Sequence, residues 1–361
     1  MVTDSRRMRS AAKVFCAAFA GCLGFLWVLV QVYSYFQLQW LPVITTNSLR
    51  VIIIVCFSAI VALGTVIARL MSHVELPVQK PTFEQSLVDA LGSALHERNY
   101  ADVIRIGIAL TRPLFEEGKF SIRLKIGKII EEAAALGGRK DVQVIALIDA
   151  IGWSLVEMGE VDEAKGHIEH GIVLSEETGQ VFYRAKGQRH LGVIYRRKGD
   201  YERARAFYQT SMSTAESVQD VHERDALVAG LHYAFASLFY HTGEYSNAME
   251  FVDKAITSFT TLNDEYRLNM SYVLKGDVQF KLMQKEKARD TFRAVLQRAD
   301  RNTEKLQVVR STLGLAEIYI SEHDWERAHR TIQQAASIDL DEFKAEAQRL
   351  KTLKAKLPNA Q

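Results

Sequence analysis

The chain has 361 residues, of which 48% are hydrophobic and 24% are charged. This length and composition provide for a sizeable core with an appendage. With 45 basic and 43 acidic side chains the net charge is only +2, which argues against a nucleic-acid partner that would need a continuous basic surface. The three cysteines, Cys16, Cys22 and Cys56, have neither the number nor the spacing of a disulfide framework or a metal site.

Two uncharged apolar runs begin the chain, at residues 14–36 and 51–68. A helix rises about 1.5 Å per residue and the hydrocarbon core of a bilayer is roughly 30 Å thick, so each run is long enough to cross a membrane or nearly so. We predict two transmembrane helices, at about 12–35 and 49–71. A cleaved signal peptide is the alternative for the first run, but the run is longer than the ~7–15 residues of a signal core.

Positive charges give this predicted hairpin an orientation. Four of them, Arg6, Arg7, Arg9 and Lys13, precede the first run, whereas the connector between the runs carries only Arg50. Lys and Arg near a membrane tend to stay on its cytoplasmic side. The interpretation is therefore an integral protein of the plasma or inner membrane whose N-terminus and C-terminal body are both cytoplasmic.

Small residues recur at four-residue spacing in both runs, for example Ala17 with Gly21 and Gly64 with Ala68. Such pairs let the backbones of two helices approach closely. Packing of the two helices against each other is one interpretation, and self-association of the hairpin into a homo-oligomer is the other.

After a proline-containing linker at residues 72–82, the chain reads as one helix after another. Apolar residues recur at spacings of three and four, and no stretch alternates for long enough to form a sheet. We therefore predict an all-α body over residues 83–361, with a charged capping helix at its C-terminal end. Residues 83–113 are interpreted as an N-terminal capping helix plus the start of the first repeat, and a full extra repeat is the alternative.

The helical part of the chain repeats. Five alanines mark equivalent positions, each 40 or 44 residues after the one before: Ala164, Ala204, Ala248, Ala288 and Ala328. A sixth copy, "PLFEEGKFSIR", precedes them. Self-similarity at a fixed period of this length is typical of a solenoid.

Each repeat has the pattern of a helical hairpin. A glycine ends the first helix, a bulky apolar residue follows two positions later, and the alanine lies three further on, where the second helix packs closely on a small residue of the first. The glycines are Gly159, Gly199 and Gly243, the bulky residues include Tyr201, Tyr245 and Trp325, and the small partners include Gly152, Gly192 and Gly276. A single hairpin cannot cover its apolar face, so neighbouring hairpins must stack.

These residues resemble the tetratricopeptide repeat family. Its signature is present in one repeat as Leu191, Gly192, Tyr195, Gly199, Tyr201 and Ala204, and the period of about 40 residues resembles the long-helix variety found in bacterial regulators. The resemblance covers about residues 100–338 and implies a right-handed superhelix. The repeat at Ala288 departs from it, with Met283 and Lys285 where a glycine and an aromatic residue belong, and is interpreted as a point of flexure or as drift.

Catalytic motifs are missing from the sequence. It contains no glycine-rich phosphate loop, no His-Glu-x-x-His and no Gly-x-Ser-x-Gly. We predict that the chain is not an enzyme and needs no metal or other cofactor.

The resemblance also implies a binding surface, the concave side formed by the first helix of each hairpin. Counting back from the repeat alanines places there, or beside it, Asp149, Trp153, Lys186, Arg189, Arg196, Tyr233, Tyr240 and Phe280. The basic side chains of this set would face an acidic or carboxylate-bearing segment of a protein or peptide partner, with the aromatic side chains as anchors. The alternative is that the charges form a solvated face.

The function predicted from these features is that of a membrane-anchored scaffold or adaptor, which binds a protein or peptide on its concave surface and localises it at the membrane. A second hypothesis is a sensor and effector, in which the repeats bind a signal and the transmembrane hairpin oligomerises to perturb the membrane. A third hypothesis is an assembly factor for a membrane complex.

Overall fold

The computed structural model describes residues 82–300 and 303–358. Both predicted membrane helices lie outside these residues, as does the linker up to residue 81. Within the described part, no helix combines the length and the apolarity needed to cross a membrane. Even α11 (Val221–Thr242), which has 22 residues, carries three charged side chains, Glu223, Arg224 and Asp225, among its first five residues. The prediction of an integral membrane location with a cytoplasmic body is therefore wrong for the part of the chain that the structure describes.

The described residues form helices and no strand, which confirms the all-α prediction. In chain order the helices are α3 (Phe83–His96), α4 (Tyr100–Glu116), α5 (Phe120–Leu136), α6 (Lys140–Ile145), the π-helix η1 (Ala146–Trp153), α7 (Ser154–Met158), α8 (Val161–Glu177), α9 (Val181–Arg197), α10 (Tyr201–Ala215), α11, α12 (Tyr245–Thr261), α13 (Glu265–Lys281), α14 (Lys285–Arg298), α15 (Lys305–Ser321), α16 (Trp325–Ala336) and α17 (Lys344–Lys354). The segments α6, η1 and α7 follow one another without a break.

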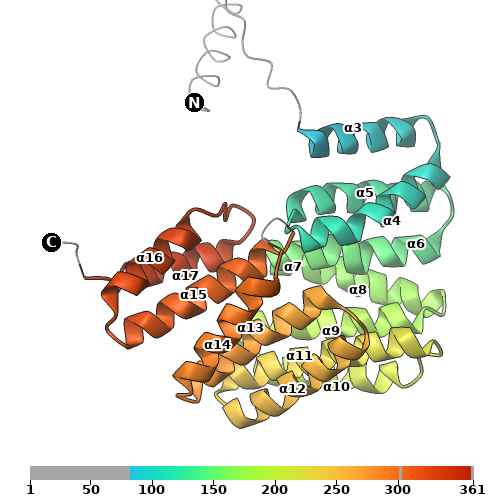
Figure 1. Cartoon of the computed structure of the whole chain (residues 1–361). Helices are drawn as coiled ribbons and strands as arrows, with labels where there is room; N and C mark the ends of the chain where they lie inside the picture. The colour runs from blue at the N-terminus through green and yellow to red at the C-terminus, as the bar shows by residue number, and fades with distance from the viewer. Residues whose placement is uncertain (1–81, 301–302, 359–361) are drawn as a thin grey trace, which may run out of the picture. The chain divides into compact units, whose positions relative to one another are not determined.

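These helices pair into hairpins that stack in chain order, α4 with α5, α6–η1–α7 with α8, and then each helix from α9 to α16 with its neighbour. The helix α3 packs on α4 and α5, and α17 packs on α15 and α16. Figure 1 shows that the stack follows a curve, which brings α15 to α17 back toward the N-terminal hairpins. The described part is thus a solenoid of tetratricopeptide-like hairpins.

Close packing of small residues holds each hairpin together. The five repeat alanines are all 0% exposed. On the facing helix a Cβ added at Gly192 would overlap the buried ring of Tyr208, and one at Gly276 would lie 2.6 Å from the ring of Phe292. These glycines are therefore required by the close approach of the two helices.

The turns between helices share one left-handed residue. Gly159, Gly199 and Gly243 have φ values of 85°, 78° and 81° and end their helices as the pattern predicts. At Met283 the same turn is made by a residue with a side chain, at φ 62°. The repeat therefore has a different residue at this position but the same left-handed turn.

Replacing Met283 by glycine should raise the free energy of unfolding by about 0.5–1 kcal/mol, because the left-handed conformation costs a residue with a Cβ about 1–2 kcal/mol and glycine loses part of that gain in chain entropy. The side chain of Met283 is 75% exposed, so little packing is lost. Urea denaturation measures the change. The control is Ala294→Gly in the exposed interior of α14, which should lower stability by about 1 kcal/mol. Equal losses in the two variants would contradict the explanation.

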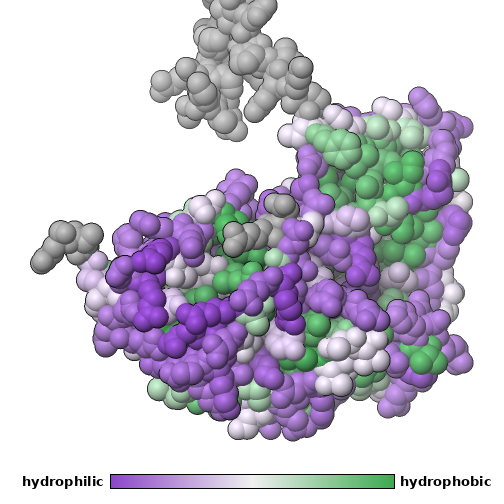
Figure 2. All heavy atoms as spheres, in the orientation of Figure 1, coloured by the Kyte–Doolittle hydropathy of each residue, from purple (hydrophilic) through white to green (hydrophobic). Residues whose placement is uncertain are grey.

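Most of the surface visible in Figure 2 is polar, and apolar side chains gather mainly over the N-terminal helices. The exposed apolar residues of these helices include Phe83, Ile106 and Leu136.

Candidate functional site

A cavity of about 250 Å³ lies where the first helices of the hairpins converge. Its wall is built by residues of α4, η1, α7, α9, α11, α13 and α15, with single contributions from α5 and α12. Every hairpin of the described part therefore contributes to one central site on the inner side of the solenoid.

Five of the eight residues predicted for the concave surface line this cavity: Asp149, Trp153, Lys186, Arg189 and Tyr233. The other three do not. Arg196 lies at the end of α9 with its guanidinium 3.4 Å from the ring of His241, and Tyr240 contacts the ring of Tyr245. Phe280 packs against the hydrophobic cluster of the C-terminal hairpins.

Three lining residues that were not predicted, Gly230, Met270 and Arg310, occupy the same place in their repeats as Lys186, which was predicted. Lys186, Gly230, Met270 and Arg310 each precede a repeat alanine by 18 residues. This position lies about one helical turn before the one used in the prediction. The spacing of 18 residues can be counted in the sequence. That this turn of the helix faces the cavity follows only from the curvature of the solenoid.

Asp149 and two cations form the structural base of the cavity. The guanidinium of Arg123 is almost fully buried, and it donates to the backbone carbonyl oxygens of Thr111 and Asp149 at 2.8 Å. The Asp149 carboxylate lies 2.6 Å from the Lys186 ammonium and 3.6 Å from the Arg123 guanidinium. Burial alone would raise the pKa of Asp149, but these two positive charges hold it well below its usual value. Asp149 is therefore ionised, and Arg123 and Lys186 share its carboxylate as their counter-charge.

Arg189 differs from these residues because it faces the cavity without a carboxylate. Among the described residues no acidic side chain lies within ion-pair distance of it, and its Nε has no hydrogen-bond partner. One Nη is 3.0 Å from His190 Nε2, and the guanidinium lies 5.9 Å from the centre of the Trp153 ring. Burial, with help from the charge of Arg267, lowers the pKa of Arg189 to about 10, so the side chain stays charged at pH 7. Within the described part of the chain it is a cation without an ion-pair partner.

His190 acts as the neutral neighbour of this cation. Burial and the charges of Arg189 and Lys186 hold the pKa of His190 well below its usual value. Its Nε2 can then accept the hydrogen bond that Arg189 donates. The ring also packs against Trp153, with 4.3 Å between the ring centres, and this contact fixes the wall beside Arg189.

The lining as a whole carries more positive than negative charge. Its cationic side chains are Arg112, Arg123, Lys186, Arg189, Arg267 and Arg310, against Asp149 and Glu157. Acids outside the lining neutralise some of the cations, such as Glu346 at 2.6 Å from Arg310. Among the described residues, Arg189 is the lining cation without an ion-pair partner, and a guanidinium in such a place binds carboxylate or another oxyanion.

Aromatic side chains form the apolar part of the wall. Trp153, Tyr233, Tyr266 and Phe115 line the cavity from four different helices. The rings of Phe115 and Tyr266 are in contact, with 5.3 Å between their centres. Apolar walls with a few charged groups are typical of sites that bury a ligand side chain.

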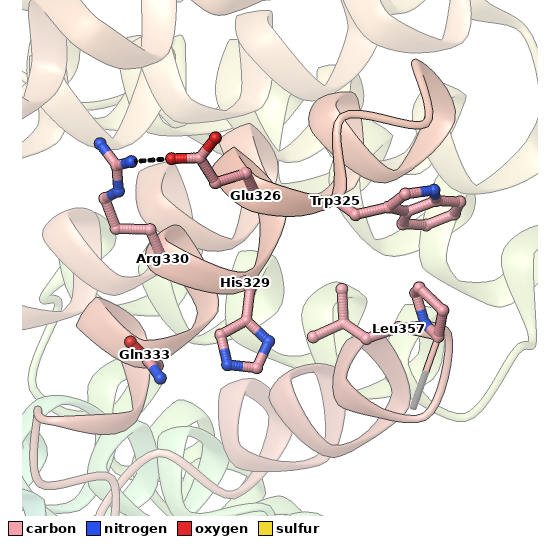
Figure 3. A pocket seen from close by; sticks show the side chains of 7 residues that line it. Trp325, Glu326, His329, Arg330, Gln333 and Leu357 are labelled. Carbon is pink, nitrogen blue, oxygen red and sulfur yellow. Dashed lines mark hydrogen bonds and ion pairs between the residues drawn. The ribbon is translucent and has the colours of Figure 1, made fainter. Parts of the chain in front are cut away.

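A larger hollow of about 520 Å³ lies along α16 (Figure 3). It is lined by Trp325, His329 and Leu357 among others, and its charged side chains Glu326 and Arg330 are paired with each other at 2.6 Å. Because its charged side chains are paired with each other and it is lined only by α16 and by residues that follow α17, we regard the central cavity as the better candidate. The part of the chain that the structure describes contains no group of three or more His, Cys, Asp or Glu side chains placed to hold a metal ion.

Comparison with known proteins supports the repeat assignment. Residues 189–221 match the family described as tetratricopeptide repeat, and no curated protein matches the sequence. Proteins with this repeat are generally non-enzymatic scaffolds, in agreement with the prediction that the chain is not an enzyme.

Solved structures with a similar arrangement of helices share little sequence with this chain. BtubC from P. vanneervenii is 14% identical, with 78% of this chain and 96% of that chain covered and a TM-score of 0.43. NprR in complex with its cognate peptide NprX is 13% identical, with 81% and 91% covered and a TM-score of 0.45. YrrB, a tetratricopeptide repeat protein with an unusual peptide-binding site, is 14% identical, with 58% and 92% covered and a TM-score of 0.32.

Proposed function

We propose that this solenoid of tetratricopeptide-like hairpins is a scaffold that binds an acidic segment of a protein partner in its central cavity. The observation that carries the proposal is Arg189, a charged guanidinium that faces the cavity without a carboxylate among the described residues. A carboxylate of the partner would supply the missing counter-charge through charge-assisted hydrogen bonds, which are stronger than neutral ones.

The rest of the cavity suits the remainder of such a segment. Trp153 and Tyr233 lie on either side of the α9 residues and offer rings for an apolar side chain next to the acid. Arg196 and Tyr240 lie further along α9 and α11, and we propose that they contact the continuation of the bound segment. The chain would act as an adaptor if a second protein then binds the partner that the cavity holds. The sensor-effector hypothesis depends on the predicted transmembrane hairpin, which lies outside the described residues. No observation separates the assembly-factor hypothesis from the scaffold.

Selection from a displayed library of random peptides against the purified full-length chain tests the proposal. We expect the selected peptides to be enriched in Asp and Glu. Binding of a selected peptide to Arg189→Met should be weaker by about 10- to 100-fold, because a hydrogen-bonded charge pair contributes about 1.5–3 kcal/mol. Fluorescence anisotropy measures the affinity.

The control is Arg105→Met on α4, whose guanidinium is exposed and paired with Asp102 at 2.7 Å, and it should bind as the wild type does. Selection of peptides without acidic residues, or equal binding by Arg189→Met, would contradict the proposal.

The same substitution should leave the fold intact or stabilise it, because a buried cation without a partner is unfavourable. We expect the free energy of unfolding of Arg189→Met to be equal to that of the wild type or higher by about 1 kcal/mol. Urea denaturation without peptide measures this value. A large loss of stability would mean that Arg189 is a structural residue.

A further inference from the structure

Two segments that are 221 residues apart in the chain meet beside the cavity. One is the end of the turn after α4 together with the start of α5, residues 118–121, and the other is the last part of the connector between α16 and α17, residues 340–343. Their contact joins the first hairpin to the last, and we call it the seam.

The first half of the seam is a helix cap supplied from the far end of the chain. The helix α5 begins without a side-chain cap from Lys119 and has no acidic residue in its first turn. Its N-terminal N–H groups and the positive end of its dipole therefore lack an anion of their own. Glu342 fills this place, because its carboxylate accepts from the backbone N–H of Ser121 at 3.2 Å and from the Ser121 hydroxyl.

The second half of the seam is an aromatic contact. Phe343 is 4% exposed, and its ring meets the ring of Phe120 edge to face, with 5.9 Å between the centres. The ring lies directly over Gly118, where a Cβ would overlap it. Leu306 closes the cluster from α15. The turn between α4 and α5 is thus shaped to receive an acidic residue followed by an aromatic one.

The seam also forms one side of the cavity. Phe115 packs against Phe120 with 6.0 Å between ring centres, and Phe115 and Leu306 both line the cavity. The helix α17 is held separately, through the Glu346–Arg310 pair at 2.6 Å and through Leu350 against the core of α15 and α16. The connector can therefore leave the seam while α17 remains in place.

We propose that Glu342 and Phe343 form a latch, which closes the solenoid around the cavity and whose release lets a partner segment enter. The latch depends on two side chains of a non-helical connector, whereas the hairpins on either side of it have their own cores. Opening at the seam therefore breaks the contact between the two ends and leaves the rest of the stack assembled. That an acidic partner segment enters the cavity rests on the proposed function. That the latch closes the solenoid does not.

Hydrogen exchange of the full-length chain without ligand tests the closure. In Phe343→Ala we expect the hydrogen-bonded amides at the start of α5, those of Ser121 and Arg123, to exchange about tenfold faster, or more, because local opening exposes them, while the amides of α17 keep their rates. Glu342→Gln, which keeps the shape of the side chain and removes its charge, should show a smaller increase at the same residues. The control is Lys344→Gln, which removes an exposed pair with Glu160 at 2.9 Å and should change neither segment. Unchanged exchange of the Ser121 and Arg123 amides in both seam variants would overturn the latch.

Access to the cavity needs a separate readout. Iodide quenching of Trp153 fluorescence, in a background in which Trp27, Trp40 and Trp325 are Phe, reports entry of a small anion whether or not any peptide binds. We expect the quenching constant to rise about twofold or more in both seam variants, and the association rate of a selected acidic peptide to rise with it. Faster exchange at the seam with unchanged quenching would overturn its role as a gate. Faster exchange and stronger quenching without any acidic peptide bound would support the latch and reject the proposed function.

Discussion

Replacing Asp149 by asparagine should lower the free energy of unfolding by about 3–5 kcal/mol at pH 7, because it leaves two cations near the cavity without their counter-charge. Arg123 has almost no exposure to water, and the ammonium of Lys186 lies 2.6 Å from the carboxylate that is lost. The isosteric change keeps the volume of the side chain, so the loss reports charge. Urea denaturation measures it.

The pH dependence of stability carries the same information. The positive neighbours of Asp149 lower its pKa in the folded chain, whereas the unfolded value is about 3.9. The contribution of Asp149 is therefore fully present above the unfolded pKa and is lost as the pH falls from there toward the lower folded pKa. We expect wild-type stability to fall more steeply below about pH 4 than that of Asp149→Asn.

The control for Asp149 is Asp141→Asn, which breaks an exposed pair with Arg139 at 2.6 Å and should cost less than about 1 kcal/mol. A loss of similar size in the two variants would mean that Asp149 is solvated in the folded chain. An identical pH profile for the wild type and Asp149→Asn would have the same meaning.

Phe292→Ala should lower the free energy of unfolding by about 3–5 kcal/mol, as is usual when a buried aromatic ring is removed and a cavity remains. The ring of Phe292 on α14 is 0% exposed. It faces Gly276 on α13 and Gly314 on α15, and a Cβ at either glycine would be too close to it. One ring therefore joins two successive hairpins at the repeat that departs most from the pattern.

The exposed ring of Phe83, which is 78% accessible to water, gives the matched control. Phe83→Ala should cost less than about 0.5 kcal/mol in the same denaturation experiment. If Phe292→Ala cost as little, the repeat at Ala288 would be loosely packed and the interpretation as a point of flexure would gain support.

The fold could be predicted because its cause is local. The repeat alanines and the glycines ahead of them specify where helices end and which faces meet, and most copies follow the same pattern. Met283 shows the limit of such a rule. A prediction from residue type alone would place no left-handed turn at Met283, because the glycine is missing. In the structure Met283 adopts the left-handed conformation in spite of its side chain.

The site could be predicted only in part because its location depends on how small rotations add up along the stack. Asp149, Arg189 and Tyr233 were identified from their place in the repeat, and they do line the cavity. Arg310 was not predicted, because it lies about one helical turn before the repeat position that was expected to face the partner. The π-helix η1 adds a further rotation between Asp149 and Trp153 that no repeat pattern encodes.

The seam could not be predicted from local pattern at all. Ser121 and Glu342 are joined only because the curve of the solenoid returns the last hairpin to the first. In the sequence Glu342 is one of many acidic residues and precedes the predicted C-terminal capping helix. Nothing near it indicates a contact with Ser121.

Photo-crosslinking from inside the cavity tests most directly whether a partner enters it. A photoreactive benzoyl-phenylalanine is placed at Tyr233, which lines the cavity, and in a second variant at the adjacent His232, which lines a separate hollow beside Lys254. We expect a selected acidic peptide to crosslink from position 233 and not from position 232, and the crosslink to disappear when Arg189→Met is added. Crosslinking from position 232 alone, or equally from both positions, would contradict binding in the central cavity.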